Sequence, residues 1–337
     1  PWFNQDRVPE VCERAAVEAA AGIVQKRPEA ISVVLYKWRS IAGLEAALFH
    51  YRRVVGSAVA KIYISWNPSL GTPPPELAKY RLSRDPPVEL LMHRFESVSN
   101  VWQPLPGLPT KAVLFADDEH LVDLEQLEVA VESFRNNPWQ MVGWFAKYHG
   151  KVKLIDFDLS LATQSVTETG DGAVPTAQPQ LNLPYHAISA FDQRFQWTYN
   201  FTSSKRPRPY SLLTRPLMLL SSDYLFAYTC LLPERIHRFL DEQEEDGADL
   251  AMNLLAQGMS GVRPLLVRSD MQDPEASRFS GSEQVTYAYS RGRQLQELMK
   301  LFVGAGKDPL QFNNVAVAQF NKIPFKKKSI KRWNDYS

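Results

Sequence analysis

The stretch ISVVLYKWRSIAGLEAALFHYRRVVGSAVAKIYISW, residues 31–66, decides the fold. Its first six residues form an apolar run typical of a buried strand, residues 41–55 carry apolar side chains at helical spacing, and residues 60–66 predict a second strand. A strand, a helix and a strand joined by short links predict a βαβ unit, which in a parallel sheet nearly always forms a right-handed crossover. The predicted fold class is therefore α/β.

Further elements continue this pattern along the chain. We expect strands at residues 88–93, 112–116 and 140–145, and helices at residues 121–134, 249–257 and 293–302. Small polar residues, glycine and proline predict loops or partly disordered segments at residues 163–183 and 203–209, and residues 326–332 concentrate basic side chains in a surface tail.

Composition excludes several classes of protein. The chain has 337 residues, of which 45% are hydrophobic and 22% charged, which excludes an extended disordered chain, collagen and a pure coiled coil. A net charge of +1 provides no overall field for attracting nucleic acid. No apolar run reaches 18 residues, and two cysteines allow at most one disulfide and exclude a four-cysteine zinc site.

Three acidic residues directly follow the apolar strand at residues 112–116. Ligands bind open parallel sheets at the carboxyl ends of the strands, so Asp117, Asp118 and Glu119 stand where a site is expected. In an extended chain Asp117 and Glu119 would point to one side and could bind Mn²⁺ or Mg²⁺ through oxygen atoms. The alternative is that these acids cap a helix beginning near Leu121.

A series of motifs resembles the exostosin-like glycosyltransferases, glycosyltransferase family 64. Their order and spacing both agree with the family from about residue 31 to residue 320. The motifs are Arg39 after the first strand, Ile64-Ser65-Trp66-Asn67, Glu96-Ser97-Val98-Ser99-Asn100, Ala112 to Glu119, Met141-Val142-Gly143-Trp144 with His149, Tyr210-Ser211-Leu212-Leu213-Thr214, Tyr228-Thr229-Cys230-Leu231-Leu232-Pro233 and Asp249-Leu250-Ala251-Met252-Asn253.

This resemblance implies a GT-A-type, Rossmann-like sheet for nucleotide-sugar binding and an acceptor-side α/β half. The implied division is a helical lead-in at residues 1–30, a nucleotide-sugar-binding half at 31–150, an acceptor-binding and catalytic half at 151–325 and the basic tail at 326–337. The implied activity is retaining, metal-dependent transfer of a hexose or N-acetylhexosamine from a UDP- or GDP-sugar to a glycan, glycolipid or glycoprotein acceptor.

The resemblance also implies roles for the donor-side residues. Asp117, Asp118 and Glu119 align with the triple-aspartate motif that binds the donor ribose and the Mn²⁺ or Mg²⁺ ion, with Glu119 and Asp117 as the expected metal ligands. Around the base and diphosphate it places the donor-binding residues Arg39, Trp66, Asn67, Ser97 and Asn100. From pattern alone, Arg39 could equally be a solvated surface residue, and Trp66 could be a core tryptophan.

Two later residues align with the catalytic centre of the family. Asp249 corresponds to an aspartate beside the reacting sugar, where it would stabilise positive charge, orient the donor or act as a nucleophile. Its alternative is the N-cap of a helix. Arg291 best matches an arginine that holds the departing diphosphate, with Arg293 as a close competitor.

The chain departs from the family at several positions. Glu119 replaces an aspartate, and its extra methylene moves the carboxylate outward. Val101 replaces an arginine, Arg215 a glycine and Ala248 an acidic residue, and a late disulfide is replaced by Gly247 and Gln294. These departures support an alternative hypothesis, a binding or scaffold protein that keeps the fold without catalysis.

The resemblance further implies the lumen of the secretory pathway, in the Golgi or the endoplasmic reticulum. A membrane anchor is expected outside the sequence given, and assembly as a homodimer is left open. The sequon Asn200-Phe201-Thr202 agrees with a glycoprotein. Nucleic-acid binding through the basic tail is not favoured, because no aromatic residues alternate with its basic side chains.

Overall fold

The computed structural model describes residues 8–20, 27–54, 58–81, 86–153, 195–201, 209–243, 246–303 and 309–313 of the chain. The loop expected at 163–183, most of the segment expected at 203–209 and the tail at 326–337 lie outside these ranges. The strands are β1 (Arg27–Lys37), β2 (Val59–Trp66), β3 (Val88–Met92), β4 (Thr110–Asp117), β5 (Val142–Lys153), β6 (Phe195–Phe201), β7 (Leu212–Ser221) and β8 (Leu265–Leu266).

Helices connect and cover these strands. They are α1 (Val8–Ala20), α2 (Ile41–Phe49), α3 (Ala78–Arg81), α4 (Leu124–Asn136), α6 (Ser222–Phe226), α7 (Glu234–Asp241), α8 (Ala248–Ser260), α9 (Pro274–Arg278) and α10 (Gly281–Val303). A 3₁₀ turn at Val98–Trp102 and π-helical turns at His50–Val54 and Ala227–Leu231 complete the described elements that the site uses. None of the described helices is both long and apolar enough to cross a membrane.

One mixed sheet organises the molecule. Its strand order is β3-β2-β1-β4-β7-β5-β6, and β8 pairs with β5. The pairs β1–β2, β1–β4 and β2–β3 are parallel, so β1, α2 and β2 form the predicted βαβ unit. The pairs β4–β7, β7–β5 and β5–β6 are antiparallel. The predicted α/β class is confirmed.

The sequence placed most strands correctly and some helix ends wrongly. The helix expected at 41–55 is α-helical as far as Phe49 and continues as a π-helical turn. The last helix begins at Gly281 rather than at residue 293. Its first half, GSEQVTYAYSRG, has no apolar stripe from which a helix could be predicted, and packing against β6 stabilises the helix in this half.

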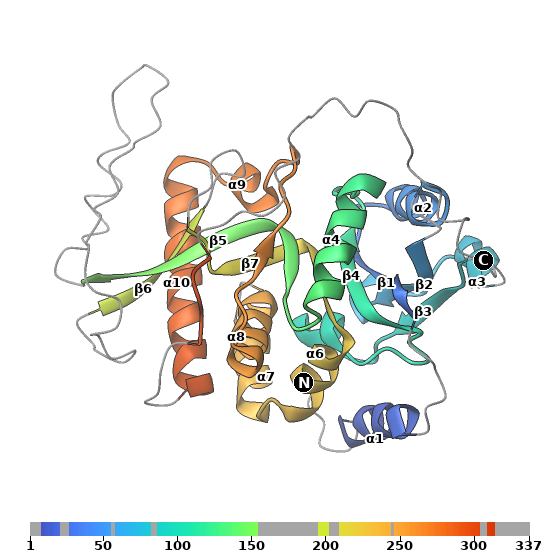
Figure 1. Cartoon of the computed structure of the whole chain (residues 1–337), viewed down its shortest axis with the longest axis horizontal. Helices are drawn as coiled ribbons and strands as arrows, with labels where there is room; N and C mark the ends of the chain where they lie inside the picture. Colours follow the sequence, from blue (N-terminus) through green and yellow to red (C-terminus); the bar gives the residue numbers. More distant parts are fainter. Residues whose placement is uncertain are drawn as a thin grey trace.

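Alternate residues of each central strand pack on opposite faces of the sheet. On β1, Val33 and Leu35 join one core with the apolar residues of α2 and α4, whereas Val34 joins a second core with those of α8 and α10. Figure 1 shows α4 on the first face, and α8 beside α10 on the second, where α8 contacts β7 and α10 contacts β6. Both faces of the sheet are therefore covered.

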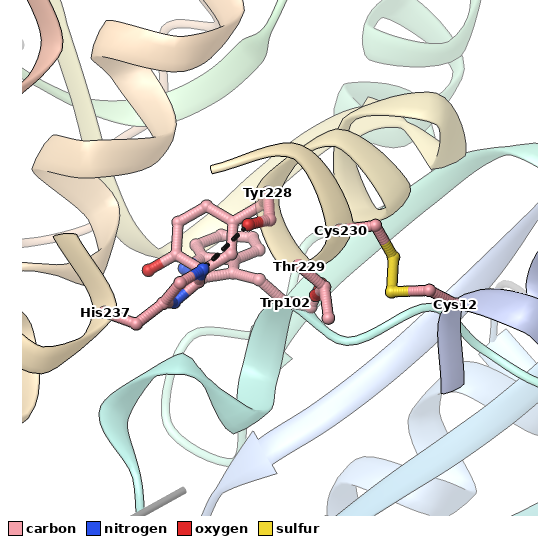
Figure 2. Close-up of a disulfide and its surroundings, with 6 residues drawn as sticks. All are labelled: Cys12, Trp102, Tyr228, Thr229, Cys230 and His237. Atoms are coloured by element: carbon pink, nitrogen blue, oxygen red, sulfur yellow. Dashed lines mark hydrogen bonds between the residues drawn. A yellow bond between two sulfur atoms is a disulfide. The ribbon is translucent and has the colours of Figure 1, made fainter. Parts of the chain in front are cut away.

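A disulfide joins the first helix to the second half of the chain. Cys12 on α1 is bonded to Cys230 in the turn Ala227–Leu231 (Figure 2). The neighbouring Thr229 donates a hydrogen bond from Oγ1 to the carbonyl oxygen of Trp102, at 3.2 Å. Because this turn also packs against the indole of Trp102, the disulfide ties α1 to the part of the fold that contacts the 3₁₀ turn Val98–Trp102.

Candidate active site

A cavity of about 400 Å³ lies at the carboxyl ends of the parallel strands. Tyr36 and Lys37 enter it from the end of β1, and Ser65 and Asn67 from the end of β2. The rest of its lining is Glu96, Ser97, Val98, Val101, Arg215, Asp241 and Asp246. β7 runs antiparallel to β4, so Arg215 near its beginning also reaches this edge of the sheet.

Two of the predicted donor-binding residues line this cavity, and a third supports them. Asn67 accepts a hydrogen bond from Nδ2 of Asn100 at 3.0 Å, and the same nitrogen donates to the carbonyl oxygen of Phe95 at 2.8 Å. Ser97 donates from Oγ to Asp241 at 2.6 Å. Asn100 is buried, so it positions Asn67 and does not itself face the cavity.

Arg215 is held firmly in the cavity wall. Its guanidinium forms an ion pair with Asp246, and its side chain is only 11% exposed. The rings of Tyr36 and Trp102 lie 5.2 and 5.7 Å from its central carbon atom. Burial lowers the pKa of Arg215, but the nearby Asp246, Tyr36 and Asp249 together outweigh this effect and the pKa is raised, so the group stays charged.

The two predicted catalytic residues form a buried ion pair. Asp249 lies in the first turn of α8 and Arg291 on α10, with Nη2 of Arg291 donating to Oδ1 of Asp249 at 2.7 Å. The side chains are 5% and 1% exposed. Helix α10 approaches β6 closely at Gly292, where a Cβ atom would lie 2.4 Å from the carbonyl oxygen of Trp197. Arg293 is exposed, so Arg291 is the arginine that meets Asp249.

Burial dominates the electrostatics of this pair. It raises the pKa of Asp249 above the ordinary carboxyl value, although the charges of Arg291 and Arg215 act to lower it. Burial also lowers the pKa of Arg291, but Asp249 together with Tyr199, Tyr287 and Glu275 outweighs this effect and raises the pKa on balance. The helix-capping interpretation of Asp249 is wrong, because Gly247 occupies the N-cap position of α8.

Asp246 connects the cavity to the buried pair. Its carboxylate pairs with Arg215, and its carbonyl oxygen accepts a hydrogen bond from Nη1 of Arg291 at 2.6 Å. Nη1 also donates to Oε1 of Gln294 at 2.8 Å. A Cβ atom on Gly247 would lie 2.5 Å from Nε2 of Gln294, so the two residues aligned with the family's late disulfide are in contact.

A polar network behind the pair was missed from the sequence. The face of Tyr199 lies 5.2 Å from the guanidinium of Arg291, and the Tyr199 hydroxyl donates to Glu275 at 2.5 Å. Glu275 also accepts a hydrogen bond from the hydroxyl of Tyr287 at 2.9 Å and lies 3.3 Å from the ammonium of the fully buried Lys147. These residues come from four separate elements, so no local motif could reveal them.

The carboxylates at residues 117–119 do not line the cavity. The chain bends directly after Asp117, whose Oδ1 accepts hydrogen bonds from the backbone N–H groups of Glu119 at 3.1 Å and His120 at 2.8 Å. Nδ1 of His120 lies 2.9 Å from the other oxygen. The expected pairing of Asp117 with Glu119 on one side of an extended chain is therefore not formed.

The other two acids of this cluster face Arg39. Oδ2 of Asp118 accepts a hydrogen bond from the backbone N–H of Arg39 at 3.0 Å. The same oxygen packs so closely on Gly43 that a Cβ atom added to this glycine would lie 1.9 Å from it. Glu119 forms an ion pair with the guanidinium of Arg39 at 2.5 Å. The capping interpretation of the cluster is wrong, because α4 begins at Leu124 and its N-cap is Asp123.

The cluster is not a complete metal site. Within the described residues, no group of three or more histidine, cysteine, aspartate or glutamate side chains could hold a metal by itself. Glu119 is 35% exposed, and its partner Arg39 is 78% exposed, so this pair costs little to open. The residues present suit a hard cation that takes one carboxylate from the chain and its other ligands from phosphate oxygens and water.

Tyr36 shows that the separate parts of the site surround one region. Burial raises the pKa of its phenol above the ordinary value. The charged groups that also act on this pKa are Arg215, Asp117, Asp246 and Asp249. Asp117 and Asp249, which are 132 positions apart in the sequence, therefore both lie close enough to the same tyrosine to act on its pKa.

Trp66 occupies the core beside the cavity. It is 2% exposed, its Nε1 donates to the carbonyl oxygen of Gly71 at 2.7 Å, and its ring lies 5.4 Å from that of Trp38. The core interpretation from the sequence agrees with this geometry, and the indole presents no face to the cavity lining. Stacking of a base on Trp66 stays a prediction that this packing does not support.

The site combines a polar cavity at the carboxyl ends of parallel strands with a buried acid–arginine pair. This combination is typical of enzymes that bind a ligand at the strand ends and catalyse its reaction there. The model of the glycosyl transferase family 64 domain matches residues 31–156 and 183–321. Because this match covers well over half of the sequence, the chain belongs to glycosyltransferase family 64 and is a glycosyltransferase. The resemblance to the exostosin-like domain predicted from the sequence is confirmed, as is the α/β class of the fold.

Individual relatives are distant. Glycosyltransferase family protein 64 C3 of Arabidopsis thaliana is 24% identical over 276 residues, which are 76% of this chain and 70% of that protein. Exostosin-like 2 of Mus musculus is 23% identical over 281 residues, which are 81% of this chain and 72% of that protein. The solved structure of GalNAc-T7 with UDP, GalNAc and Mn²⁺ is 11% identical, with a TM-score of 0.42 over 71% of this chain and 42% of that chain.

Proposed function

We propose that this glycosyltransferase acts with retention of configuration, using Mn²⁺ or Mg²⁺, and moves a hexose or N-acetylhexosamine from a UDP- or GDP-sugar to a glycan, glycolipid or glycoprotein. The observation that carries the proposal is the buried Asp249–Arg291 pair, joined through Asp246 to the cavity at the strand ends. A donor in the cavity would present its sugar toward this pair.

The hydrogen bonds of Asp249 suggest its role. Nη2 of Arg291 and the backbone N–H of Leu250 both donate to Oδ1, at 2.7 and 2.8 Å. In the described ranges no hydrogen bond to Oδ2 is found, so we assign Oδ2 to the anomeric carbon, where it would stabilise developing positive charge. The role predicted for Arg291, holding the diphosphate, stays a prediction, because its Nη atoms already hold Asp249, Asp246 and Gln294.

A donor panel tests the activity. UDP- and GDP-sugars would be incubated with the protein, Mn²⁺ and glycan acceptors, and the released nucleotide would be measured. We expect turnover with at least one donor and a loss on the order of 100-fold or more in Asp249→Asn. Arg293→Gln is the matched control, because this exposed residue lies on the same helix as Arg291, and it should keep wild-type turnover.

The second candidate function is a binding or scaffold protein of the same fold. Val101, Arg215 and Ala248, which depart from the family, favour it, and the structure places Val101 and Arg215 in one cavity lining. This candidate predicts background release from every donor, unchanged by Asp249→Asn. Nucleotide bound without turnover would select it over the enzymatic proposal.

The proposed metal ion would be held by Glu119 and would neutralise charge on the departing diphosphate. Glu119→Gln should lower the affinity for Mn²⁺ in the presence of UDP or GDP, measured by titration calorimetry. Glu128→Gln, an exposed carboxylate on α4, is the control and should leave the affinity unchanged. Equal affinity in wild type and Glu119→Gln would remove Glu119 as the ligand.

We further propose that the protein acts in the lumen of the Golgi or the endoplasmic reticulum. The Cys12–Cys230 disulfide supports this, because disulfides persist in oxidising compartments. Protection of the chain from added protease in sealed microsomes is the expected result, and digestion without detergent would contradict it. An anchor outside the sequence given and a homodimer stay predictions.

A further inference from the structure

The cavity holds a preorganised cation that the activity described above does not use. Lys37 and Arg215 are the basic residues of its lining. Lys37 is exposed at the end of β1, whereas Arg215 is 89% buried and fixed between Tyr36 and Trp102. A guanidinium fixed in this way loses little conformational freedom when it binds a ligand.

Arg215 has donor capacity to spare. A guanidinium carries five N–H donors in a planar fork. Nη2 donates to Oδ2 of Asp246, and Nε is buried with no partner in the part of the chain that the structure describes. An unpaired buried donor is costly, so a ligand that satisfies this edge of the guanidinium gains the full value of the hydrogen bond.

Arg291 has fewer donors to spare, although its Nε is also buried without a partner in the part of the chain that the structure describes. Its two Nη atoms are committed to Asp249, to the carbonyl oxygen of Asp246 and to Gln294. Asp246 is the counter-ion of Arg215, and its side chain is 43% exposed, so it can turn to solvent when another anion pairs with Arg215. Of the two buried arginines, Arg215 is therefore the one arranged to receive an anion.

We propose that Arg215 binds an anionic oxygen group of the donor in this cavity, with Asp246 as its exchangeable counter-ion. The group is a phosphate of the nucleotide diphosphate or a carboxylate on the transferred sugar, since both present the paired oxygen atoms that a guanidinium fork bonds. The identity of the donor rests on the proposed function, whereas the anion site itself rests on the geometry of Arg215.

Ligands that gain one anionic group at a time test this inference. Affinities of wild type and Arg215→Gln would be measured by titration calorimetry for uridine, UMP, UDP, UDP-glucose and UDP-glucuronate, with the guanosine series beside them and with inorganic pyrophosphate and glucuronate as fragments. We expect wild type and Arg215→Gln to bind the nucleosides with equal affinity. For the first ligand in the series that carries the contacted group, and for those after it, the affinity of Arg215→Gln should be roughly ten- to hundredfold lower than that of wild type.

Two further variants separate binding from folding. Asp246→Asn keeps Arg215 and the carbonyl oxygen that holds Arg291 but removes the competing carboxylate, so it should bind the same ligand as tightly as wild type or more tightly. A merely structural ion pair would instead weaken binding in both variants. Arg238→Gln removes an exposed arginine on α7 and should match wild type, and circular dichroism establishes that each variant is folded.

The outcomes are distinct. A loss that begins at UMP or UDP assigns the phosphate, and a loss seen only with the glucuronate ligands assigns the sugar carboxylate; both support the inference. Equal affinities of wild type and folded Arg215→Gln for every anion overturn it. If wild type binds no nucleotide, the proposed function fails, but the binding of pyrophosphate and glucuronate still tests the anion site at Arg215. Binding of either fragment by wild type that is lost in Arg215→Gln supports the inference. If wild type binds neither fragment, the inference is overturned as well.

Discussion

Two arginine–carboxylate pairs of the candidate site differ in exposure. In the pair Arg39–Glu119 the side chains are 78% and 35% exposed, and in the pair Arg291–Asp249 they are 1% and 5% exposed. Both pairs have short contacts, 2.5 and 2.7 Å. Their chemistry is the same, and their surroundings decide what each can do.

The exposed pair can open, and the buried pair cannot. An ion pair in water contributes little, so Glu119 can exchange Arg39 for a metal ion at small cost. A buried pair has already lost its hydration, so breaking it leaves an uncompensated charge in the interior. The difference indicates that the acid cluster can exchange partners and that the Asp249–Arg291 pair is a fixed part of the proposed catalytic centre.

The largest effect is expected from breaking the buried pair. Arg291→Gln leaves the Asp249 carboxylate buried without its partner and should lower the free energy of unfolding by about 3–5 kcal/mol. Urea denaturation followed by circular dichroism measures this change. The double variant with Asp249→Asn should recover part of the loss, and a loss below about 1 kcal/mol in the single variant would contradict the contrast.

Buried histidine should contribute a second large effect, on the dependence of stability on pH. Burial lowers the pKa of His237 to about 4 from the usual 6.5. Its ring is fully buried and bonds the carbonyl oxygen of Tyr228 through Nε2 at 3.0 Å (Figure 2). The unfolded chain takes up the proton near pH 6.5 and the folded chain only near pH 4, so stability is present above pH 6.5 and is lost as pH falls through about 4.

The measurement compares wild type with His237→Gln in urea at several pH values. Between pH 7 and pH 4 wild type should lose about 2–3 kcal/mol more stability than the variant. Parallel curves for the two proteins would show that His237 titrates normally in the folded state.

A smaller effect is expected where Asp118 lies against α2. Gly43→Ala would place a Cβ atom 1.9 Å from Oδ2 of Asp118, so the carboxylate must leave the backbone N–H of Arg39. We expect a loss of about 1–2 kcal/mol, measured as a shift in thermal unfolding. Gly258→Ala on α8 is the control, because its nearest neighbour, Cβ of Pro309, would lie at 3.6 Å, and its stability should be unchanged or slightly higher.

The smallest effect belongs to the exposed pair. Arg39→Gln should change the free energy of unfolding by less than about 1 kcal/mol, while raising the affinity of Glu119 for Mn²⁺ in titrations with nucleotide. Weaker Mn²⁺ binding in Arg39→Gln would show that Arg39 assists the ion rather than competing with it.

The sequence predicted the parallel part of the sheet because each of its strands contains a mostly apolar run. It could not predict how the antiparallel strands β5, β6 and β7 complete the sheet, since their pairing depends on contacts far apart in the chain. The first half of α10 was missed for a related reason, because it is stabilised by packing against β6 rather than by its own pattern.

The candidate site shows the same division. Ser97 and Asn67 line the cavity, Asn100 supports Asn67, and Asp249 meets Arg291, whereas the roles predicted for these residues toward a donor stay predictions. The conformation of residues 117–119 was not predictable from alternation, because local hydrogen bonds to Asp117 turn the chain. Arg215 was noted only as a departure, and its place in the cavity depends on a strand pairing that the sequence does not encode locally.

The central claim is that the donor nucleotide binds in the cavity at the carboxyl ends of β1 and β2. Hydrogen–deuterium exchange of wild type with and without UDP or GDP, in the presence of Mn²⁺, tests it most directly. The account predicts slower exchange at residues 36–37, 65–67 and 96–101, which line or support the cavity, and at residues 117–120. Protection confined to other regions, or absent with both nucleotides at saturating concentration, would contradict it.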